Sequence, residues 1–224
     1  MTSHSPPPTL ARHLWLEAVM ILSGSFSGRR HRVEGKTPAK PGEQFAKALM
    51  RHAFVPIDPA SDKTRALGWV NPRAILDEDL RWDRLALGPH VVLGLRIDTR
   101  KVSRTMLRAR LDQVLAERRR EKPGARIPRE ERLRIAKALE TEMLVAATPS
   151  TAIQEVWWNL PASTVWFSSS SAKLNDEMTD LFERTFGLKL VPLGPFTLAE
   201  AHTEAAGKGG GALERAKPTD LRVR

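Results

Sequence analysis

LRIDTRKVSRTMLRARLDQVLAERRREKPGARIPREERLRIAKALETEMLV, from Leu95 to Val145, contains two helical patterns separated by a short connection. In the first pattern apolar residues recur at i, i+4, i+7 and i+8, which is the spacing of one face of a helix, and the second pattern continues with an apolar stripe of its own. The two stripes consist of Leu107, Leu111, Val114 and Leu115, and of Leu133, Ala136, Leu139 (or Glu140), Met143 and Leu144. Pro123 and Gly124 end the first helix and Pro128 suits the start of the second, so the stretch predicts a helical hairpin.

The same stretch carries most of the net charge. Between Arg96 and Glu140 there are 15 Lys or Arg residues and 7 Asp or Glu residues, which is +8 of the chain's +10. A local excess of this kind is typical of proteins that bind polyanions. Basic helix surfaces also keep proteins soluble, and Glu117 and Glu121 can pair with arginines at helical spacing, so that interpretation stays open. The predicted phosphate-binding residues are Lys101, Arg104, Arg108, Arg118, Arg119, Arg120, Lys122, Arg126 and Arg129.

Composition narrows the class of protein. With 41% hydrophobic and 28% charged residues, the 224-residue chain is typical of a soluble globular protein. The absence of cysteine excludes disulfides and thiolate metal sites and fits a reducing compartment, so we expect a cytoplasmic protein. No apolar run approaches the roughly 18 residues that a membrane span needs. The basic balance favours an anionic partner, either a nucleic acid or a membrane surface, and we expect the nucleic acid.

Strand patterns flank the hairpin on both sides. The clearest strand is His90 to Ile97, which is rich in β-branched residues and is expected to be central. A serine before Leu174 suits a helix N-cap, and Gly187 suits the end of that helix. The remaining predicted elements are an exposed or edge strand at 25–33, a helix at 43–53, a strand at 67–72, a β-hairpin of 153–158 with 164–167, and a strand at 188–192. The order predicts an α+β fold with a mixed or antiparallel sheet and packed helices.

Four parts of the chain are expected. They are a disordered extension at 1–19, an α+β body at 20–98 plus 149–196, the inserted helical hairpin at 99–148, and a flexible tail at 197–224. The extension contains three consecutive prolines, and Met20 is followed by ILSGSF, which is typical of a natural start. Translation from Met20 is therefore our hypothesis. The tail is rich in glycine, alanine and charge.

The sequence contains no convincing catalytic or metal-binding motif. Its six histidines are scattered without the spacing of metal ligands, and no phosphate-binding glycine loop is present. The carboxylates at Asp77, Glu78, Asp79 and Asp83 are an alternative Mg²⁺ site for a nuclease. They are nearly consecutive in one polar segment, however, whereas a nuclease needs carboxylates that converge from several elements. We therefore expect no catalytic residue, no metal and no cofactor.

The tryptophans offer two interpretations. Trp157, Trp158 and Trp166 could stack on unpaired bases, because stacking on aromatic side chains tolerates any base. Neighbouring residues of a strand point to opposite faces of the sheet, so at least one of Trp157 and Trp158 is expected in the core.

Three segments together resemble the RdgC family of recombination-associated, DNA-binding bacterial proteins. They are RHAFVPI at 51–57 before GWVNP at 68–72, VVLGLRIDTRKV at 91–102, and LFERTFGLKLVP at 181–192, in a resemblance that runs from about Met20 to Pro192. It implies an α+β protein that forms a ring-shaped homodimer around duplex DNA with little sequence preference. It also implies restraint of recombination driven by RecA-type filaments. Some members are named as exonucleases.

One departure from the family leaves the assembly open. Longer members continue past the Val-Pro strand with a further structured segment that helps to close the ring, whereas this sequence continues with the glycine-rich tail. A closed ring, a clamp, an open dimer and a monomer all remain alternatives. Three functions follow from the sequence: a sequence-tolerant DNA-binding protein of the nucleoid without catalysis, a metal-dependent exonuclease, and a scaffold that docks an acidic protein.

Overall fold

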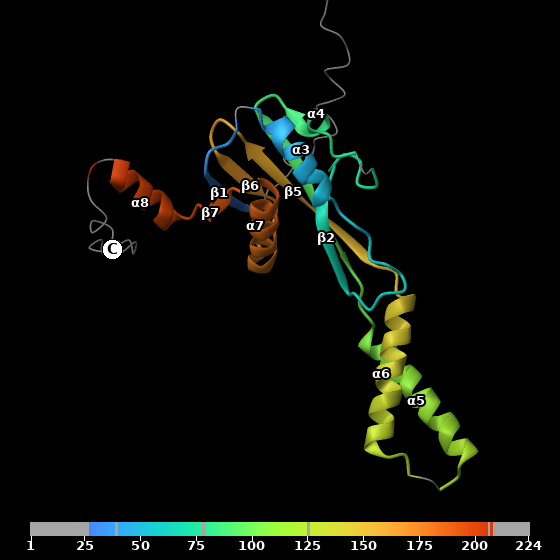
Figure 1. Ribbon diagram of the computed structural model, residues 1–224. Coiled ribbons are helices and arrows are strands. Elements are labelled where there is room, and N and C mark those ends of the chain that lie inside the picture. The colour runs from blue at the N-terminus through green and yellow to red at the C-terminus, as the bar shows by residue number, and fades with distance from the viewer. Residues whose placement is uncertain (1–26, 39, 78, 125, 206, 208–224) are drawn as a thin grey trace, which may run out of the picture.

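The computed structural model describes residues 27–38, 40–77, 79–124, 126–205 and 207, and within them the chain forms an α+β body with a projecting arm (Figure 1). The α+β class predicted from the sequence is thereby confirmed. The strands are β1 (Arg29–Glu34), β2 (Arg65–Val70), β3 (Ala86–Leu87), β4 (His90–Thr99), β5 (Ser150–Asn159), β6 (Thr164–Phe167) and β7 (Lys189–Pro192). The helices are α3 (Pro41–Arg51), α4 (Trp82–Leu85), α5 (Arg104–Glu121), α6 (Arg129–Ala146), α7 (Ala172–Phe186) and α8 (Pro195–Ala205).

The strands form one antiparallel sheet in the order β2-β4-β5-β6-β1-β7, with β3 beside β4. β4 lies inside the sheet, as predicted. The first strand was predicted to be exposed or at an edge; it is not an edge strand, because β1 pairs with both β6 and β7, although three of its six residues are exposed. Arg30 and Arg32 lie on the face opposite the buried His31 and Val33, whereas Arg29 shares their face and is exposed at the start of the strand. The run of basic residues concealed this alternation in the sequence.

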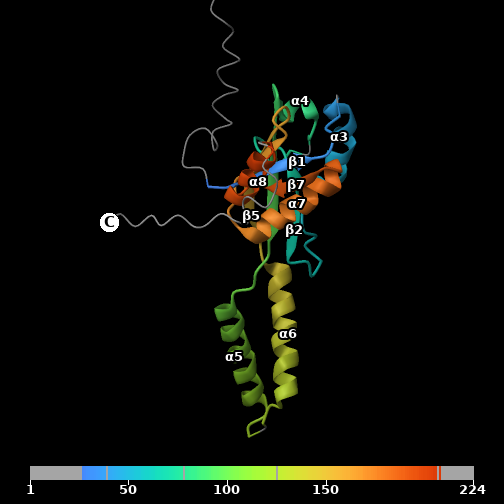
Figure 2. The ribbon, with the colours of Figure 1, turned by 90° about the vertical axis from the view of Figure 1, so that its left-hand side faces the viewer.

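Helices α3 and α7 pack on one face of the sheet and enclose the main core (Figure 2). Trp158 of β5 is fully buried there, with its ring centroid 5.1 Å from that of Phe182. The indole of Trp69 in β2 donates a hydrogen bond of 2.8 Å to the hydroxyl of Thr185 in α7. The predicted caps of α7 are also present, since the Ser171 side chain accepts a hydrogen bond at its start and Gly187 ends it with φ 67°.

The arm consists of α5 and α6 and is inserted between two neighbouring strands of the sheet. β4 and β5 pair along ten residues each, and the last pair, Thr99 with Ser150, lies where the arm begins. Each arm helix has 18 residues, so the arm extends roughly 27 Å beyond the body (Figures 1 and 2). The predicted helical hairpin is therefore present as a projection.

Packing inside the arm is sparse. Leu115 is the one buried residue that the structure describes in α5 and α6, at 2% exposure. Leu133, which the sequence pattern assigns to the apolar stripe, is instead 60% exposed. Two helices side by side shield only the residues that face the partner, so part of each stripe remains in solvent.

The structure describes part of the predicted C-terminal tail but none of the predicted N-terminal extension. Helix α8 occupies Pro195–Ala205, so residues 197–205 of the predicted tail are helical. The extension at 1–19, the proposed start at Met20 and residues 208–224 lie outside the described residues. No described helix combines the length and apolar character required to traverse a lipid bilayer.

Candidate nucleic-acid interface

All nine predicted phosphate-binding residues are exposed. Lys101 lies in the link between β4 and the arm, and Arg104 and Arg108 lie in the first turns of α5. The others surround the far end of the arm, where α5 ends and α6 begins. At that end, Arg118, Arg119 and Arg120 form the last turn of α5, where positive charge also stabilises the helix dipole.

Eight of these nine cations form no ion pair within the described part of the chain. The exception is Arg118, whose guanidinium pairs with the carboxylate of Glu131 across the hairpin. This pair joins the end of α5 to the start of α6 and so fixes the tip. The remaining cations keep their charge available for a phosphate.

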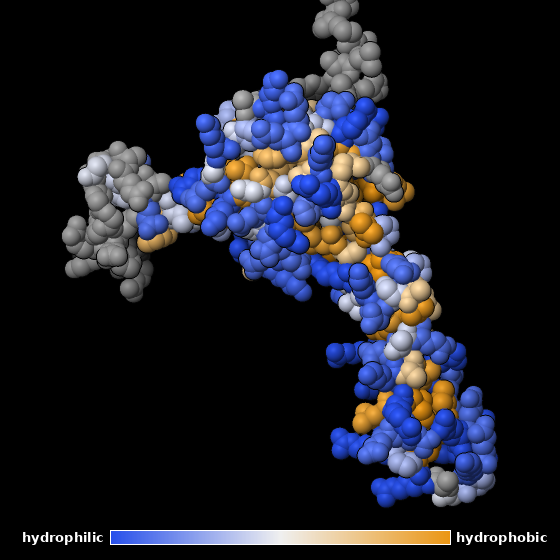
Figure 3. Space-filling model, in the orientation of Figure 1, coloured by the Kyte–Doolittle hydropathy of each residue, from blue (hydrophilic) through white to orange (hydrophobic). Residues whose placement is uncertain are grey.

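Sequence reasoning missed four further cations on the arm. They are exposed, form no ion pair with described residues, and extend the basic surface toward the body: Arg110, Arg132, Arg134 and Lys137. Their helical spacing was a usable signal, but the charge density around the connection drew the prediction to the tip. Figure 3 shows hydrophilic residues along much of the arm, interrupted by hydrophobic ones.

The acidic segment before α4 is neutralised by neighbouring arginines. Arg84 lies 3.4 Å from a carboxylate oxygen of Asp77 and 3.1 Å from one of Asp79, and Arg81 also pairs with Asp79 at 3.1 Å. A hydrogen bond from the Arg81 backbone N–H, with the charges of both arginines, lowers the pKa of Asp79. Glu78 lies outside the described residues, and among the described ones no three metal-ligating side chains are grouped to hold an ion. The paired carboxylates are therefore poor candidates for the alternative Mg²⁺ site.

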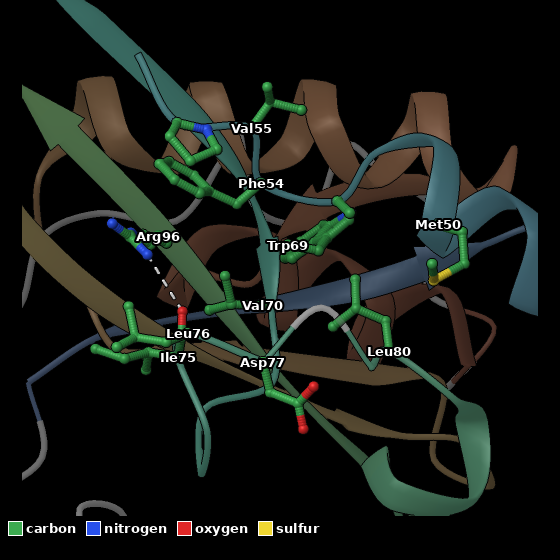
Figure 4. Close-up of a pocket in the computed structure, with 12 residues that line it drawn as sticks. Met50, Phe54, Val55, Trp69, Val70, Ile75, Leu76, Asp77, Leu80 and Arg96 are labelled. Carbon is green, nitrogen blue, oxygen red and sulfur yellow. Dashed lines mark hydrogen bonds between the residues drawn. The ribbon is translucent and has the colours of Figure 1, made fainter. Parts of the chain in front are cut away.

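An apolar pocket of about 430 Å³ lies beside β2, between the segments that follow α3 and β2 (Figure 4). The guanidinium of Arg96 lies 4.2 Å from the ring centroid of Phe54 and forms two hydrogen bonds with Asp98, at 2.9 and 3.0 Å. It also donates to the carbonyl of Ile75. Arg96 is therefore held by other groups of the fold, and the other charged side chain of this lining, Asp77, pairs with Arg84.

The tryptophans divide between the two faces of the sheet, as predicted. Trp158 is in the core, while Trp157 and Trp166 form a cross-strand pair on the opposite face. Arg30 lies 5.2 Å from the Trp166 ring centroid, and the His90 ring lies 5.3 Å from that of Trp157. These contacts account for the two residues within the fold, so the arm remains the stronger candidate interface.

Residues 30–206 match the family model described as "Putative exonuclease, RdgC". The chain belongs to the RdgC family. The resemblance inferred from three short segments is thus confirmed, and the RdgC match spans both the body and the arm. A comparison with curated proteins finds no match.

Proposed function

We propose that this RdgC-family protein binds duplex DNA through the phosphate backbone and modulates homologous recombination without catalysing a reaction. The observation that supports this proposal is the set of twelve exposed cations of the arm and its links, eight of them predicted from the sequence, that lack an ion pair among the described residues. They are held away from the body on a two-helix projection (Figure 1). Cations held in this way meet a polyanion without first breaking internal pairs.

Binding through phosphates predicts two measurable properties, which are tolerance of any DNA sequence and a steep dependence on salt. Contacts to phosphates fix the position of a protein on DNA but do not distinguish bases, so binding is expected to tolerate any sequence. Each neutralised phosphate releases counterions. If about six phosphates are neutralised, log K falls with log salt at a slope of about −5.

Replacing Arg118, Arg119 and Arg120 together by alanine tests the tip. We expect weaker binding to all duplex sequences and a salt slope smaller in magnitude by about 2, since Arg118 is already paired with Glu131. Fluorescence anisotropy at several salt concentrations measures both quantities.

A charge-matched control removes three exposed lysines from the body instead, at Lys47, Lys63 and Lys173. These residues form no ion pair with described residues, and the variant has the same net charge as the tip variant because each loses three cations. We expect it to keep the salt slope of the unmodified protein. An equal loss in both variants, or an unchanged slope in the tip variant, would remove the tip from the interface.

The proposal also includes assembly as a homodimer and action on RecA-type filaments, as the resemblance implies. Met106, Leu133 and Val145 are exposed apolar side chains of the arm, and we expect assembly to cover part of this surface. Light scattering measures the mass in solution, and a monomer at micromolar concentration contradicts this part. DNA binding would place the protein in the nucleoid of the cytoplasm.

The exonuclease alternative is favoured by the description of the family. Asp77 and Asp79 are engaged by Arg81 and Arg84, so we expect a linear duplex to stay intact in Mg²⁺ or Mn²⁺. Degradation that disappears in Asp77→Ala or Asp79→Ala would overturn the non-catalytic proposal. The scaffold alternative requires an acidic protein partner and no salt-sensitive binding to DNA.

A further inference from the structure

A second cationic feature lies where the arm joins the body. It is a pocket of about 450 Å³, which we name the arm-root pocket. Its walls come from the body, from the link after β4 and from both arm helices: Thr64, Arg100, Lys101, Val102, Arg104, Leu107, Lys137, Glu140, Thr141 and Leu144. Lys137 is separated by more than 30 residues from Lys101 and Arg104 in the sequence, so only the hairpin brings them to one cavity.

The charges around the arm-root pocket are unbalanced. Four cations share its walls with a single carboxylate, that of Glu140. Lys101, Arg104 and Lys137 are exposed and form no ion pair with any described residue. Like charges held around one cavity repel each other and raise the local potential, which a bound anion relieves.

Arg100 adds a buried charge that solubility does not explain. It is only 3% exposed, and its guanidinium donates to the backbone carbonyls of Asp58 at 2.7 Å, Ser61 at 3.0 Å and Ile57 at 3.4 Å. These acceptors are neutral, the guanidinium has no carboxylate partner among the described residues, and its Nε is buried without a hydrogen bond. A buried charge normally requires an opposite charge nearby. Arg100 thus lines the pocket and contributes a positive charge that only backbone carbonyls, and no described carboxylate, offset.

The start of α5 also carries positive charge, because the N-terminal end of a helix dipole is positive. Ser103 caps this helix, because its side chain accepts a hydrogen bond from the backbone N–H of Met106. The N–H groups that precede Met106 in the first turn have no intrahelical partner, as at the start of any helix. These groups and the helix dipole attract anions. They reinforce the charges of Lys101 and Arg104 at the same end of the arm.

We propose that the arm-root pocket binds a phosphate group. A phosphate offers several acceptor oxygens, which suits charged donors converging from Lys101, Arg104 and Lys137. The source is either a nucleic-acid backbone or a free phosphate compound, and in the first case the inference rests on the proposed function. Because the donors come from the link and from both arm helices, the bound phosphate connects the two helices at the base of the arm.

Inorganic pyrophosphate titrated into the full chain at low salt, followed by calorimetry, tests the site. We expect Lys137→Gln to weaken binding roughly tenfold, because one charge-assisted hydrogen bond is lost. Arg134→Gln is the matched control, since Arg134 is exposed on the same helix but outside the pocket. We expect Glu140→Gln to bind pyrophosphate more tightly than the unmodified protein does, because the substitution removes a negative charge from the pocket wall. A purely structural role of Glu140 would not raise the affinity.

Equal weakening in Lys137→Gln and Arg134→Gln would show only diffuse attraction and overturn the site. So would the absence of pyrophosphate binding while duplex binding persists. The tip variant at Arg118, Arg119 and Arg120 separates the two proposals, because we expect it to lose duplex affinity and keep pyrophosphate affinity. Pyrophosphate binding that depends on Lys137, without any binding of duplex, supports the pocket and contradicts the proposed function.

Discussion

His31 is a titratable residue in the interior of the sheet. It is 1% exposed, and its Nδ1 has no hydrogen-bond partner among the described residues. Burial, together with the charge of Arg29, lowers the pKa of His31 to about 4. The unfolded chain has the ordinary value near 6.5 and so binds more protons between these two pH values. The stability associated with neutral His31 is therefore complete above pH 6.5 and is lost as pH falls toward 4.

The expected contribution of His31 to the free energy of unfolding changes by roughly 3 kcal/mol across that window. His31→Leu removes the titrating group from an apolar site, so its unfolding free energy should fall less than that of the unmodified protein as pH is lowered from 7 to 4.5. Urea unfolding at several pH values measures the difference. Parallel curves for the variant and the unmodified protein would contradict the assignment.

Gly68, the first residue of the segment GWVNP, lies where the fold has no room for a side chain. A Cβ at this position would lie 2.5 Å from the Cα of Phe54, which is far inside normal contact distance. Two backbone hydrogen bonds hold the two segments together. The backbone N–H of Trp69 donates to the carbonyl of His52 at 3.0 Å, and the carbonyl of Trp69 accepts from the N–H of Phe54 at 2.9 Å. Any side chain at Gly68 would push this connection away from β2.

At the scale of elements, the arm depends on few apolar contacts. Leu115→Ala removes the one buried side chain described in α5 and α6, and similar core substitutions cost about 2–5 kcal/mol. We expect the two arm helices to open locally while the β4–β5 ladder persists. Amide hydrogen exchange should then accelerate in the arm and stay slow in the sheet.

Leu133→Ala is the matched control for this element. Leu133 is 60% exposed, so its truncation should leave exchange in both regions close to that of the unmodified protein. Accelerated exchange throughout the body of Leu115→Ala would show that the arm and the sheet unfold as one unit. Equal effects of the two substitutions would contradict the assignment of Leu115 as the centre of arm packing.

For the whole molecule, the main feature is the separation of a packed body from a cationic projection. The ten-residue pairing of β4 with β5 supports the arm, because both links emerge side by side at the end of this ladder. The body uses Trp69, Trp158 and the aromatic residues of α7 to build its core. The arm can therefore carry charges that repel each other without destabilising the main core, which is the arrangement that the DNA-binding proposal uses.

Much of the candidate interface could be predicted from the sequence. The nine arm cations are exposed, as charge on the polar face of an amphipathic helix requires, but their pairing was not predictable. The Arg118–Glu131 pair joins residues on different helices, and the arginine partners of Asp77 and Asp79 depend on how the chain turns before α4. Local spacing does not specify such contacts.

The amino-acid sequence alone determined the α+β class, the helical hairpin with its proline-glycine connection, and α7 with its caps. These features follow from periodicity and from backbone preferences that act within a few residues. Only the tertiary structure decided the interior place of β1, the exposure of Leu133 and the meeting of Lys137 with Lys101 and Arg104 at the arm root. Each of these depends on which distant segment lies alongside, and a local pattern of apolar and charged residues is compatible with several such neighbours.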